Sequence, residues 1–382
     1  MRVLVTGGTG FVGSHTVAAL LGHGHQVRLL VRAPERITPA LGPLGITQVD
    51  AQVGDVTNPA TVQQAMRGCQ AVVHAAAVYS LDPRRAAVMA QTNPTGTDIV
   101  LGAAHRQGLD PIIYVSSVGV FWPITAARPT TGLPLGAGVG PYTRSKLAAE
   151  QLARGYQQAG APVVITYPAG VLGPHDPHLS DTVRAICDVL RGRWPVLPRG
   201  RLPLVDVREV AALHAAVLRP GRGARRYLLA GPAVPLVDLV GLLGELTGRR
   251  LPQTTAPGWL LRPASRLVDR AQRLLPVRLP FSAEAVAATL SIGTDVEVDD
   301  TATRQELAIQ RRELRQTAAD TVRWLAEQGH ITARQAGALA GTRLPPGSLA
   351  ALPESASVAA DDRAGHQHEG EEPPRIPVPA HL

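Results

Sequence analysis

The sequence predicts an α/β protein built on a doubly wound parallel sheet, with a smaller and mainly helical C-terminal portion. Up to about residue 170, short apolar runs alternate with helix-like stretches. Several of these runs are apolar throughout, which is typical of strands covered by helices on both faces. Beyond Pro168, helical stretches are separated by Pro- and Gly-rich connections. This change in rhythm predicts two interleaved domains, residues 1–170 and residues 171–333.

The elements of the first domain follow in order from this alternation. Strands are expected where the apolar runs lie, at residues 2–6, 26–32, 47–53, 71–75, 111–116 and 163–167. Helices are expected between them, at residues 11–21, 59–66, 84–107 and 143–159. Parallel strands need such crossover helices, so the two sets of elements agree with each other.

The second domain is expected to pack against the carboxyl edge of the sheet and to bind a substrate there. Its helices are expected at residues 181–191, 207–218, 236–247, 264–275 and 312–328, with a short strand at 226–230. From residue 334 to 382 the chain is Pro-rich and acidic, with few large apolar side chains. Such a segment buries too little apolar surface to offset its ordering entropy, which predicts a disordered tail.

The composition argues against several classes of function. The formal net charge is +8, but the arginines are scattered without basic runs, so no nucleic-acid partner is expected. The two cysteines, Cys69 and Cys187, have neither metal-ligand nor disulfide spacing, so no metal site is expected. No run of about 20 apolar residues suits a membrane span, and the early glycines leave no room for a signal peptide. These features predict a cytoplasmic protein.

A glycine-rich turn follows the first strand directly, in the run Thr6-Gly7-Gly8-Thr9-Gly10-Phe11-Val12-Gly13. Bare backbone at such a turn lets a pyrophosphate approach, and the helix that follows offers unpaired N–H groups and a positive dipole end. The order of strand, glycine turn and helix is the context that a dinucleotide site requires. The sequence therefore predicts a dinucleotide cofactor at Gly7, Gly10, Phe11, Val12 and Gly13.

The end of the second predicted strand bears on the choice of cofactor. NAD enzymes usually place a carboxylate there for the ribose hydroxyls, whereas this chain has Arg32. A guanidinium suits a 2′-phosphate, so NADP is expected, with NAD as the alternative. A solvated arginine would give the same sequence. Asp55, after the third strand, is expected near the adenine, although a helix or turn cap explains it equally well.

Tyr142 and Lys146 are the strongest local signal in the chain. Lys146 is the only lysine, and it lies four residues after the tyrosine, on the same face of an expected helix. A phenol with a pKa of about 10 exchanges protons poorly at neutral pH, and a nearby ammonium lowers that pKa. An ammonium can also hold ribose hydroxyls. The pair therefore predicts proton transfer beside a nicotinamide ring.

These motifs stand in the order found in the extended short-chain dehydrogenases/reductases. They include Gly54-Asp55-Val56, His74-Ala75-Ala76-Ala77, Asn93-Pro94-Thr95-Gly96-Thr97, Tyr114-Val115-Ser116-Ser117 and Tyr142-Thr143-Arg144-Ser145-Lys146. Over residues 1–333 the chain resembles the NAD-dependent epimerase/dehydratase family. Within that family it is most similar to the dihydroflavonol-reductase-like and 3β-hydroxysteroid-dehydrogenase-like branches. The resemblance implies a Rossmann fold, and a homodimer is common in the family.

The resemblance also assigns roles to residues. Ser117 would bind the substrate oxygen, although a Ser at a strand end can also cap a turn, and Tyr142 would be the acid/base. Asn93 would support a water relay to Lys146. The remaining cofactor contacts would come from Val56, Ala75, Ala76 and Pro168. Two residues depart from the family pattern: Pro94 follows Asn93 and is expected to kink or restart the helix, and Tyr167 replaces an arginine common before Pro168.

The same residues serve carbonyl reduction, alcohol oxidation, epimerisation and dehydration, since the cofactor carries the hydride. Sugar dehydratases add an acidic pair beside the serine, but here Ser117 precedes Val118-Gly119-Val120-Phe121. Residues 125–141 contain no acid and suggest a mostly apolar substrate wall. We therefore expect NADP(H)-dependent reduction of a hydrophobic ketone or aldehyde, or oxidation of the alcohol.

Two alternatives remain. One is an NAD-dependent sugar-nucleotide epimerase, in which Arg184, Arg193 or Arg199 would bind the diphosphate. The other is a non-catalytic NADP(H)-binding redox sensor. The stretch 259–275 adds a separate question, because Trp259, Leu260 and Leu267 fall near one helical face with arginines among them. Core packing is the first expectation, a substrate lid the second and contact with an anionic membrane the third.

Overall fold

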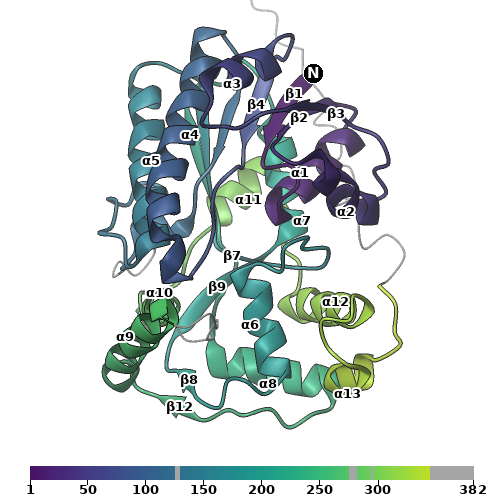
Figure 1. Ribbon diagram of the computed structural model, residues 1–382, viewed down its shortest axis with the longest axis vertical. Coiled ribbons are helices and arrows are strands. Elements are labelled where there is room, and N and C mark those ends of the chain that lie inside the picture. Colours follow the sequence, from purple (N-terminus) through teal and green to yellow (C-terminus); the bar gives the residue numbers. More distant parts are fainter. Residues whose placement is uncertain (125–129, 275–281, 294–295, 345–382) are drawn as a thin grey trace, which may run out of the picture. The chain divides into compact units, whose positions relative to one another are not determined.

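The computed structural model describes residues 1–124, 130–274, 282–293 and 296–344, with a seven-stranded parallel sheet at its centre (Figure 1). The strand order is β10-β6-β5-β4-β1-β2-β3, and every neighbouring pair is parallel. The strands are β1 (Arg2–Thr6), β2 (Gln26–Val31), β3 (Asp50–Val53), β4 (Ala71–His74), β5 (Ile112–Val115), β6 (Val163–Pro168) and β10 (Arg225–Leu229). The predicted doubly wound sheet is confirmed, and the strand expected at 226–230 is its edge strand β10.

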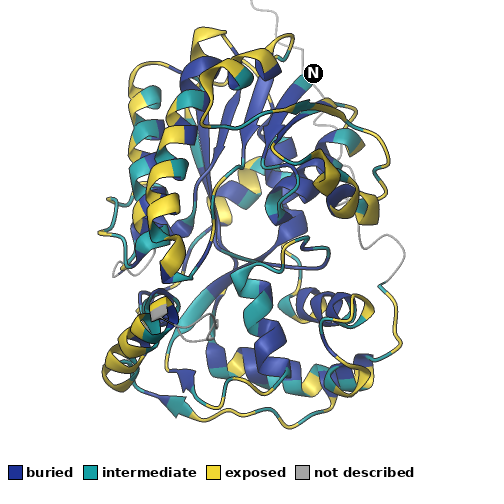
Figure 2. Cartoon of the chain, in the orientation of Figure 1, coloured by how far each residue is buried: buried dark blue, intermediate teal, exposed yellow. Residues whose placement is uncertain are grey.

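Helices cover both faces of this sheet (Figure 1). Helices α4 and α5 pack side by side on one face, and α1 and α7 on the other. The helices of this part are α1 (Phe11–Gly22), α2 (Ile37–Leu41), α3 (Pro59–Met66), α4 (Ala86–Arg106), α5 (Pro141–Gln158), α7 (Val207–Ala216) and α11 (Thr301–Leu307). Every residue of β4, β5 and β6 is buried, as the uninterrupted apolar runs predict (Figure 2).

Helix α4 runs without a break through Pro94, so the expected restart at this proline is wrong. A proline inside a helix removes one backbone hydrogen bond. Here the helix continues because its flanking turns are held by packing: Met89 and Leu101 are fully buried on either side of the proline.

The C-terminal portion contains short strands that the sequence reading missed. Strands β7 (Gly170–Leu172), β9 (Arg201–Asp206) and β11 (Ala233–Pro235) form a three-stranded sheet, and β8 (Leu197–Pro198) pairs with β12 (Thr255–Ala256). Pro198, Pro203 and Pro235 lie inside these strands, and proline in a short run reads as a loop. The helices around them are α6 (Asp181–Leu190), α8 (Leu236–Thr247), α9 (Gly258–Leu274), α10 (Ala283–Thr289), α12 (Leu314–Glu327) and α13 (Ala333–Ala336).

Two expectations near the C-terminus change. Helix α9 begins at Gly258, five residues before Pro263, which therefore lies inside the helix and not at its start. Residues 334–339, which fall in the predicted disordered tail, form the rest of α13 and a 3₁₀ turn, with Ala336 and Leu339 buried. The rest of the predicted tail, residues 345–382, lies outside the described residues. None of the described helices is long and apolar enough to cross a membrane.

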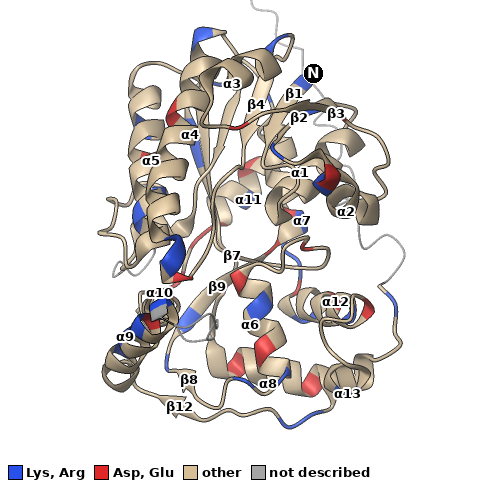
Figure 3. Cartoon of the chain, viewed as in Figure 1, with Lys and Arg blue, Asp and Glu red and all other residues tan. Residues whose placement is uncertain are grey.

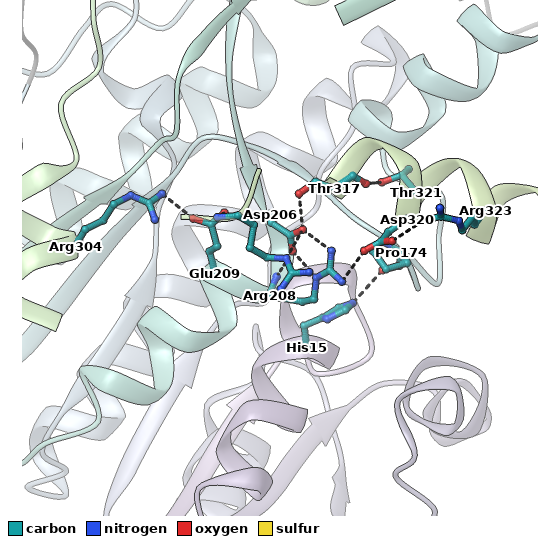
Figure 4. Close-up of polar contacts among 11 residues, drawn as sticks. His15, Pro174, Asp206, Arg208, Glu209, Arg304, Thr317, Asp320, Thr321 and Arg323 are labelled. Atoms are coloured by element: carbon teal, nitrogen blue, oxygen red, sulfur yellow. Dashed lines mark hydrogen bonds and ion pairs between the residues drawn. The ribbon is translucent and has the colours of Figure 1, made fainter. Parts of the chain in front are cut away.

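A buried ionic network joins α7 and β9 to α12 (Figure 4). Arg208 binds Asp206 through Nε at 2.8 Å and through a second nitrogen at 2.6 Å, and it binds Asp320 at 3.0 Å. Thr317 of α12 donates its hydroxyl to Asp206 at 2.7 Å. Each charge is thus paired and hydrogen-bonded, which is the condition for burying it. The network fixes α12 against the end of β9.

Candidate active site

The glycine turn lies where the strand order of the central sheet reverses. Strand β1 has β2 on one side and β4 on the other, so a crevice opens outside their carboxyl ends. Thr6 at the end of β1 and His74 at the end of β4 are hydrogen-bonded at 2.7 Å. The turn after β1 and the Ala75-Ala76-Ala77 segment after β4 therefore meet at this crevice.

The three spaced glycines of the turn are needed for different reasons. Gly7 has φ +74°, and a Cβ there would lie 2.6 Å from the backbone nitrogen of Ala76. A Cβ on Gly13 would lie 2.0 Å from the carbonyl oxygen of Gly7. Gly10 is different, because an added Cβ would meet only that same oxygen, at 3.3 Å, and otherwise open space. The turn thus packs closely on its own backbone and stays open on the side of Gly10, as a phosphate cradle requires.

One cavity of about 600 Å³ brings most of the predicted site residues together. This volume is in the range of small-molecule and cofactor sites. Its wall includes the predicted residues Gly7, Gly10, Phe11, Val12, Gly13, Ala75, Ser117, Tyr142, Lys146 and Pro168. The helix α1, whose N-terminus forms part of this wall, has no acidic residue in its first turn, so nothing there opposes an anion.

Lys146 is buried at the back of this wall. Its Nζ donates to the carbonyl oxygen of Val115 at 2.8 Å and lies 4.6 Å from the ring centroid of Tyr114. Burial lowers the pKa of Lys146 to about 8, while the carboxylate of Glu150 acts in the opposite direction. An ammonium has three N–H donors, so the contact with Val115 leaves donors for a ligand in the cavity.

Tyr142 differs from the expectation in one respect. Burial, followed by the charge of Glu284, raises the pKa of Tyr142 above its ordinary value of 10.0, and a hydrogen bond with Ser117 acts in the opposite direction. The sequence predicted a pKa lowered by Lys146. That ammonium is instead engaged with Val115, so in this structure the phenol holds its proton firmly at neutral pH.

Ser117 combines both roles that the sequence left open. Its Oγ accepts the N–H of Gly119 at 3.2 Å and so caps the 3₁₀ turn of residues 118–121. The same side chain lines the cavity, and its hydrogen-bonding capacity acts to lower the pKa of Tyr142. A cap fixes the rotamer of a hydroxyl, so the turn positions Ser117 beside the phenol.

Asn93 lies outside the cavity wall and links two segments through hydrogen bonds. Its Oδ1 accepts the N–H of Val78 at 2.7 Å, and its Nδ2 donates to the oxygen of Val78 at 3.0 Å and to Ser145 at 2.8 Å. These bonds tie the segment after β4 to α5, the helix that carries Tyr142 and Lys146. The structure therefore gives Asn93 a positioning contact and no direct contact with Lys146.

Four predicted cofactor residues also lie off the cavity wall. Arg32 and Asp55 face each other at 4.0 Å, with 67% and 40% of their side chains exposed. Asp55 also accepts the N–H and the hydroxyl of Thr57, which with Arg32 lower its pKa against the opposing effect of burial. Val56 packs near Gly96, and Ala76 donates its N–H to Thr6 at 3.3 Å.

Glu284 is a site residue that the sequence reading missed. From α10, its carboxylate accepts the N–H of Tyr142 at 3.0 Å, the N–H of Thr143 at 2.9 Å and the hydroxyl of Thr143 at 3.1 Å. It therefore caps the N-terminus of α5 from 142 residues away in sequence. A Cβ on Gly140 would lie 2.2 Å from this carboxyl group, so only glycine fits there. No local motif marks a glutamate of this kind.

Beyond the wall that carries Ser117, Tyr142 and Lys146, the cavity is mainly apolar. Its far side is lined by Trp122, Leu179, Leu202, Leu236, Leu239, Val240, Leu243, Ala285 and Ala288. Two arginines on this side differ: Arg193 pairs with Asp188 at 3.1 Å, whereas Arg184 donates one N–H to the oxygen of Leu179 at 3.1 Å and has a buried Nε without a hydrogen-bond partner. Arg199 lies off the wall and donates to Thr255.

Comparisons with known proteins agree with this geometry. The model of the NAD dependent epimerase/dehydratase family matches residues 3–230. The chain is 33% identical to a Synechocystis protein named "Putative dihydroflavonol 4-reductase", over 86% of this chain and 95% of that protein. It is 28% identical to sterol demethylase protein B of Methylococcus capsulatus, over 87% and 100% of the two chains.

A solved structure shares the fold. The dTDP-glucose 4,6-dehydratase of Streptomyces venezuelae, crystallised with NAD and TYD, superposes with a TM-score of 0.66 at 24% identity, over 86% of this chain and 97% of that one. At this identity the match establishes the fold alone. The family match and the 33% identical relative show that the chain belongs to the NAD dependent epimerase/dehydratase family. It is an NAD(P)-dependent oxidoreductase of the extended short-chain dehydrogenase/reductase type.

Proposed function

We propose that this protein reduces a ketone or aldehyde group on a hydrophobic small molecule, or oxidises the corresponding alcohol, with Tyr142 as the acid/base. The observation that carries the proposal is that the glycine turn, Ser117, Tyr142 and Lys146 line one cavity whose far side is apolar. A bound dihydronicotinamide supplies the hydride. The protein then has to orient the carbonyl and deliver a proton to its oxygen.

The chain's residues suit these two tasks. Ser117, held by the turn that it caps, supports a hydrogen bond to the carbonyl oxygen as negative charge develops on it. Tyr142, whose pKa is raised, carries its proton at neutral pH and is therefore poised as the donor. The donors that Lys146 retains suit the ribose hydroxyls. A protonated phenol favours the reductive direction at neutral pH.

Two of the three arginines considered for a diphosphate are poorly available to one, which weighs against the epimerase alternative. A sugar nucleotide brings a diphosphate, which needs free cationic side chains. Arg193 is paired with Asp188 and Arg199 lies off the wall, so Arg184, whose buried Nε has no hydrogen-bond partner, is the one candidate left on the wall. No carboxylate follows Ser117 directly, which also disfavours dehydration. The redox-sensor alternative would leave Ser117, Tyr142 and Lys146 without a use.

A substrate panel tests the proposal. NADPH oxidation is followed with aromatic ketones, steroid-like ketones and UDP-sugars, using the full chain. We expect turnover of at least one apolar ketone and none of the UDP-sugars. Epimerisation of a UDP-sugar without ketone reduction would establish the epimerase, and NADPH binding without any turnover would establish the sensor.

We further propose NADP(H) as the preferred cofactor, because exposed Arg32 stands at the end of β2 where a 2′-phosphate would lie. Arg32→Ala is expected to raise KM for NADPH about tenfold or more and to leave KM for NADH unchanged, because only the phosphorylated ribose meets the guanidinium. Arg36→Ala, beyond the strand end, is the matched control. Equal effects on both cofactors would refute this preference.

A further inference from the structure

Helix α9 exposes large apolar side chains that the sequence reading expected in a core. The exposed fractions are 77% for Trp259, 50% for Leu260 and 63% for Leu267. Core packing is therefore wrong for these three residues. Among the described residues such exposure of large apolar groups is uncommon, and Figure 2 shows the outer side of α9 exposed along most of its length.

The two sides of α9 are chemically distinct. Ser265 and Gln272 are buried on the inner side, and Gln272 lines the cavity. Asp269, the acidic residue of the helix, accepts the N–H of Ala283 at 3.1 Å and so fastens α9 to α10. The inner side thus already has its partners within the protein.

The outer side combines an apolar strip with a basic strip. Leu260, Ala264 and Leu267 are spaced by four and three residues and share one strip. Trp259 lies on the neighbouring strip, which also contains Arg262, Arg266, Arg270 and Arg273, seen as part of the blue band of α9 in Figure 3. Asp269 is the single carboxylate of α9; it borders this strip, and the charge of Arg273 acts to lower its pKa against the raising effect of burial. Apolar residues with Trp at their edge and arginines beside them are typical of a helix that lies in a membrane interface.

We propose that α9 docks this protein onto the surface of a bilayer containing anionic lipid. Leu260 and Leu267 enter the interface, Trp259 lies at the headgroup level, and the arginines contact lipid phosphates. A net charge of +8 adds long-range attraction to such a surface.

A second copy of the chain fits this face less well. A two-fold interface places the same surface on both subunits, so four arginines would face four arginines with only the bordering Asp269 of each copy to offset them. The docked helix also backs onto the substrate cavity through Gln272, on its opposite side. Membrane docking would therefore hold an apolar substrate and its cavity at the same interface, although the docking itself does not depend on the reaction.

Vesicle flotation with the full chain tests the proposal. Vesicles of phosphatidylcholine alone are compared with vesicles that also contain phosphatidylglycerol. We expect binding to the anionic vesicles that is at least about tenfold tighter and that weakens as salt is added. The emission of Trp259 should shift to the blue on binding, and Trp259→Phe should remove that shift.

Matched variants identify the face. Leu260→Ser with Leu267→Ser, and separately Arg266→Gln with Arg270→Gln, are each expected to weaken binding about tenfold or more. Val88→Ser, which changes an exposed valine on α4, should leave binding unchanged. Failure of the wild type to bind anionic vesicles, or equal binding by the α9 variants, would overturn the proposal. So would dissociation of a dimer by these variants, because a second copy would then be the occupant.

Discussion

At the scale of single residues, Tyr142 is controlled from two sides. Burial and then the negative charge of Glu284 raise the pKa of the phenol, whereas the hydrogen-bonding capacity of Ser117 acts to lower it. Lys146 lies one helical turn away but donates to Val115. The proton on Tyr142 is therefore held mainly by burial and by Glu284, a residue that reaches the site from another part of the chain.

Glu284→Gln is expected to lower the pKa of Tyr142, because the change removes the negative charge beside the phenol. A reductase needs the protonated phenol, so the alkaline limb of its kcat profile should move to lower pH by about one unit. Glu284→Asp, which keeps the charge, should leave the limb near its wild-type pH. The measurement is kcat against pH under saturating NADPH.

Glu245→Gln, an exposed glutamate on α8 paired with Arg315, is the control for the loss of a carboxylate in general. An unshifted alkaline limb in Glu284→Gln would show that Glu284 only caps α5 and has no influence on the proton.

At the scale of elements, the site depends on helices held by distant side chains. Glu284 of α10 and Asn93 of α4 both fix α5, and the Arg208 network fixes α12 against β9. Asn93 is recognisable in sequence because it belongs to a family motif. Glu284 and Asp320 are not, because a single carboxylate that meets its partner only in the folded chain leaves no local pattern.

Arg208→Ala is expected to lower the free energy of unfolding by about 3 kcal/mol, because it removes the buried cation that Asp206 and Asp320 share and leaves them only Arg312 at 3.4 Å and Arg323 at 3.1 Å. Denaturant midpoints measure the loss. Arg315→Ala, which breaks an exposed ion pair with Glu245, should cost less than about 1 kcal/mol.

If Arg208→Ala does not fold, Arg208→Lys serves instead, because it keeps the positive charge but loses the planar guanidinium that binds two carboxylates. It should give an intermediate loss in the free energy of unfolding. Losses of the same size for Arg208→Ala and Arg315→Ala would mean that the buried network contributes nothing beyond a surface pair.

At the scale of the whole molecule, the sequence predicts the first domain, residues 1–170, better than the rest of the chain. Glycine spacing, buried strands and the Tyr142–Lys146 pair are local patterns, so they can be read before the chain is folded. The β7-β9-β11 sheet was missed because its strands are short and two of them contain proline. The outer face of α9 was assigned to a core because apolar residues at helical spacing look the same whether they face a core or solvent.

Buried histidines predict how stability depends on pH. Burial lowers the pKa to about 4 for His15 and to about 3 for His74 and His214. These rings are neutral in the folded protein but charge in the unfolded chain below about pH 6.5. The contribution of each neutral ring to the free energy of unfolding is therefore complete above pH 6.5. It decreases as the pH drops towards 4, by up to about 1.4 kcal/mol per pH unit for each ring.

Thermal unfolding between pH 7 and pH 4 checks this dependence. His214→Asn, which removes one of the buried rings, should reduce the slope relative to the wild type. A melting temperature that does not change over this interval would contradict the assignment of neutral buried histidines.

The proposed reaction depends on Tyr142 as the proton donor in the cavity formed with the glycine turn. The most direct test compares kcat and NADPH affinity in the wild type, in Tyr142→Phe and in Tyr79→Phe, whose ring packs 4.7 Å from that of Tyr142 in the same cavity. We predict that Tyr142→Phe lowers kcat for ketone reduction by about 10²- to 10⁴-fold while NADPH binds with unchanged affinity, and that Tyr79→Phe stays near the wild type. A Tyr142→Phe enzyme with wild-type kcat would contradict the account.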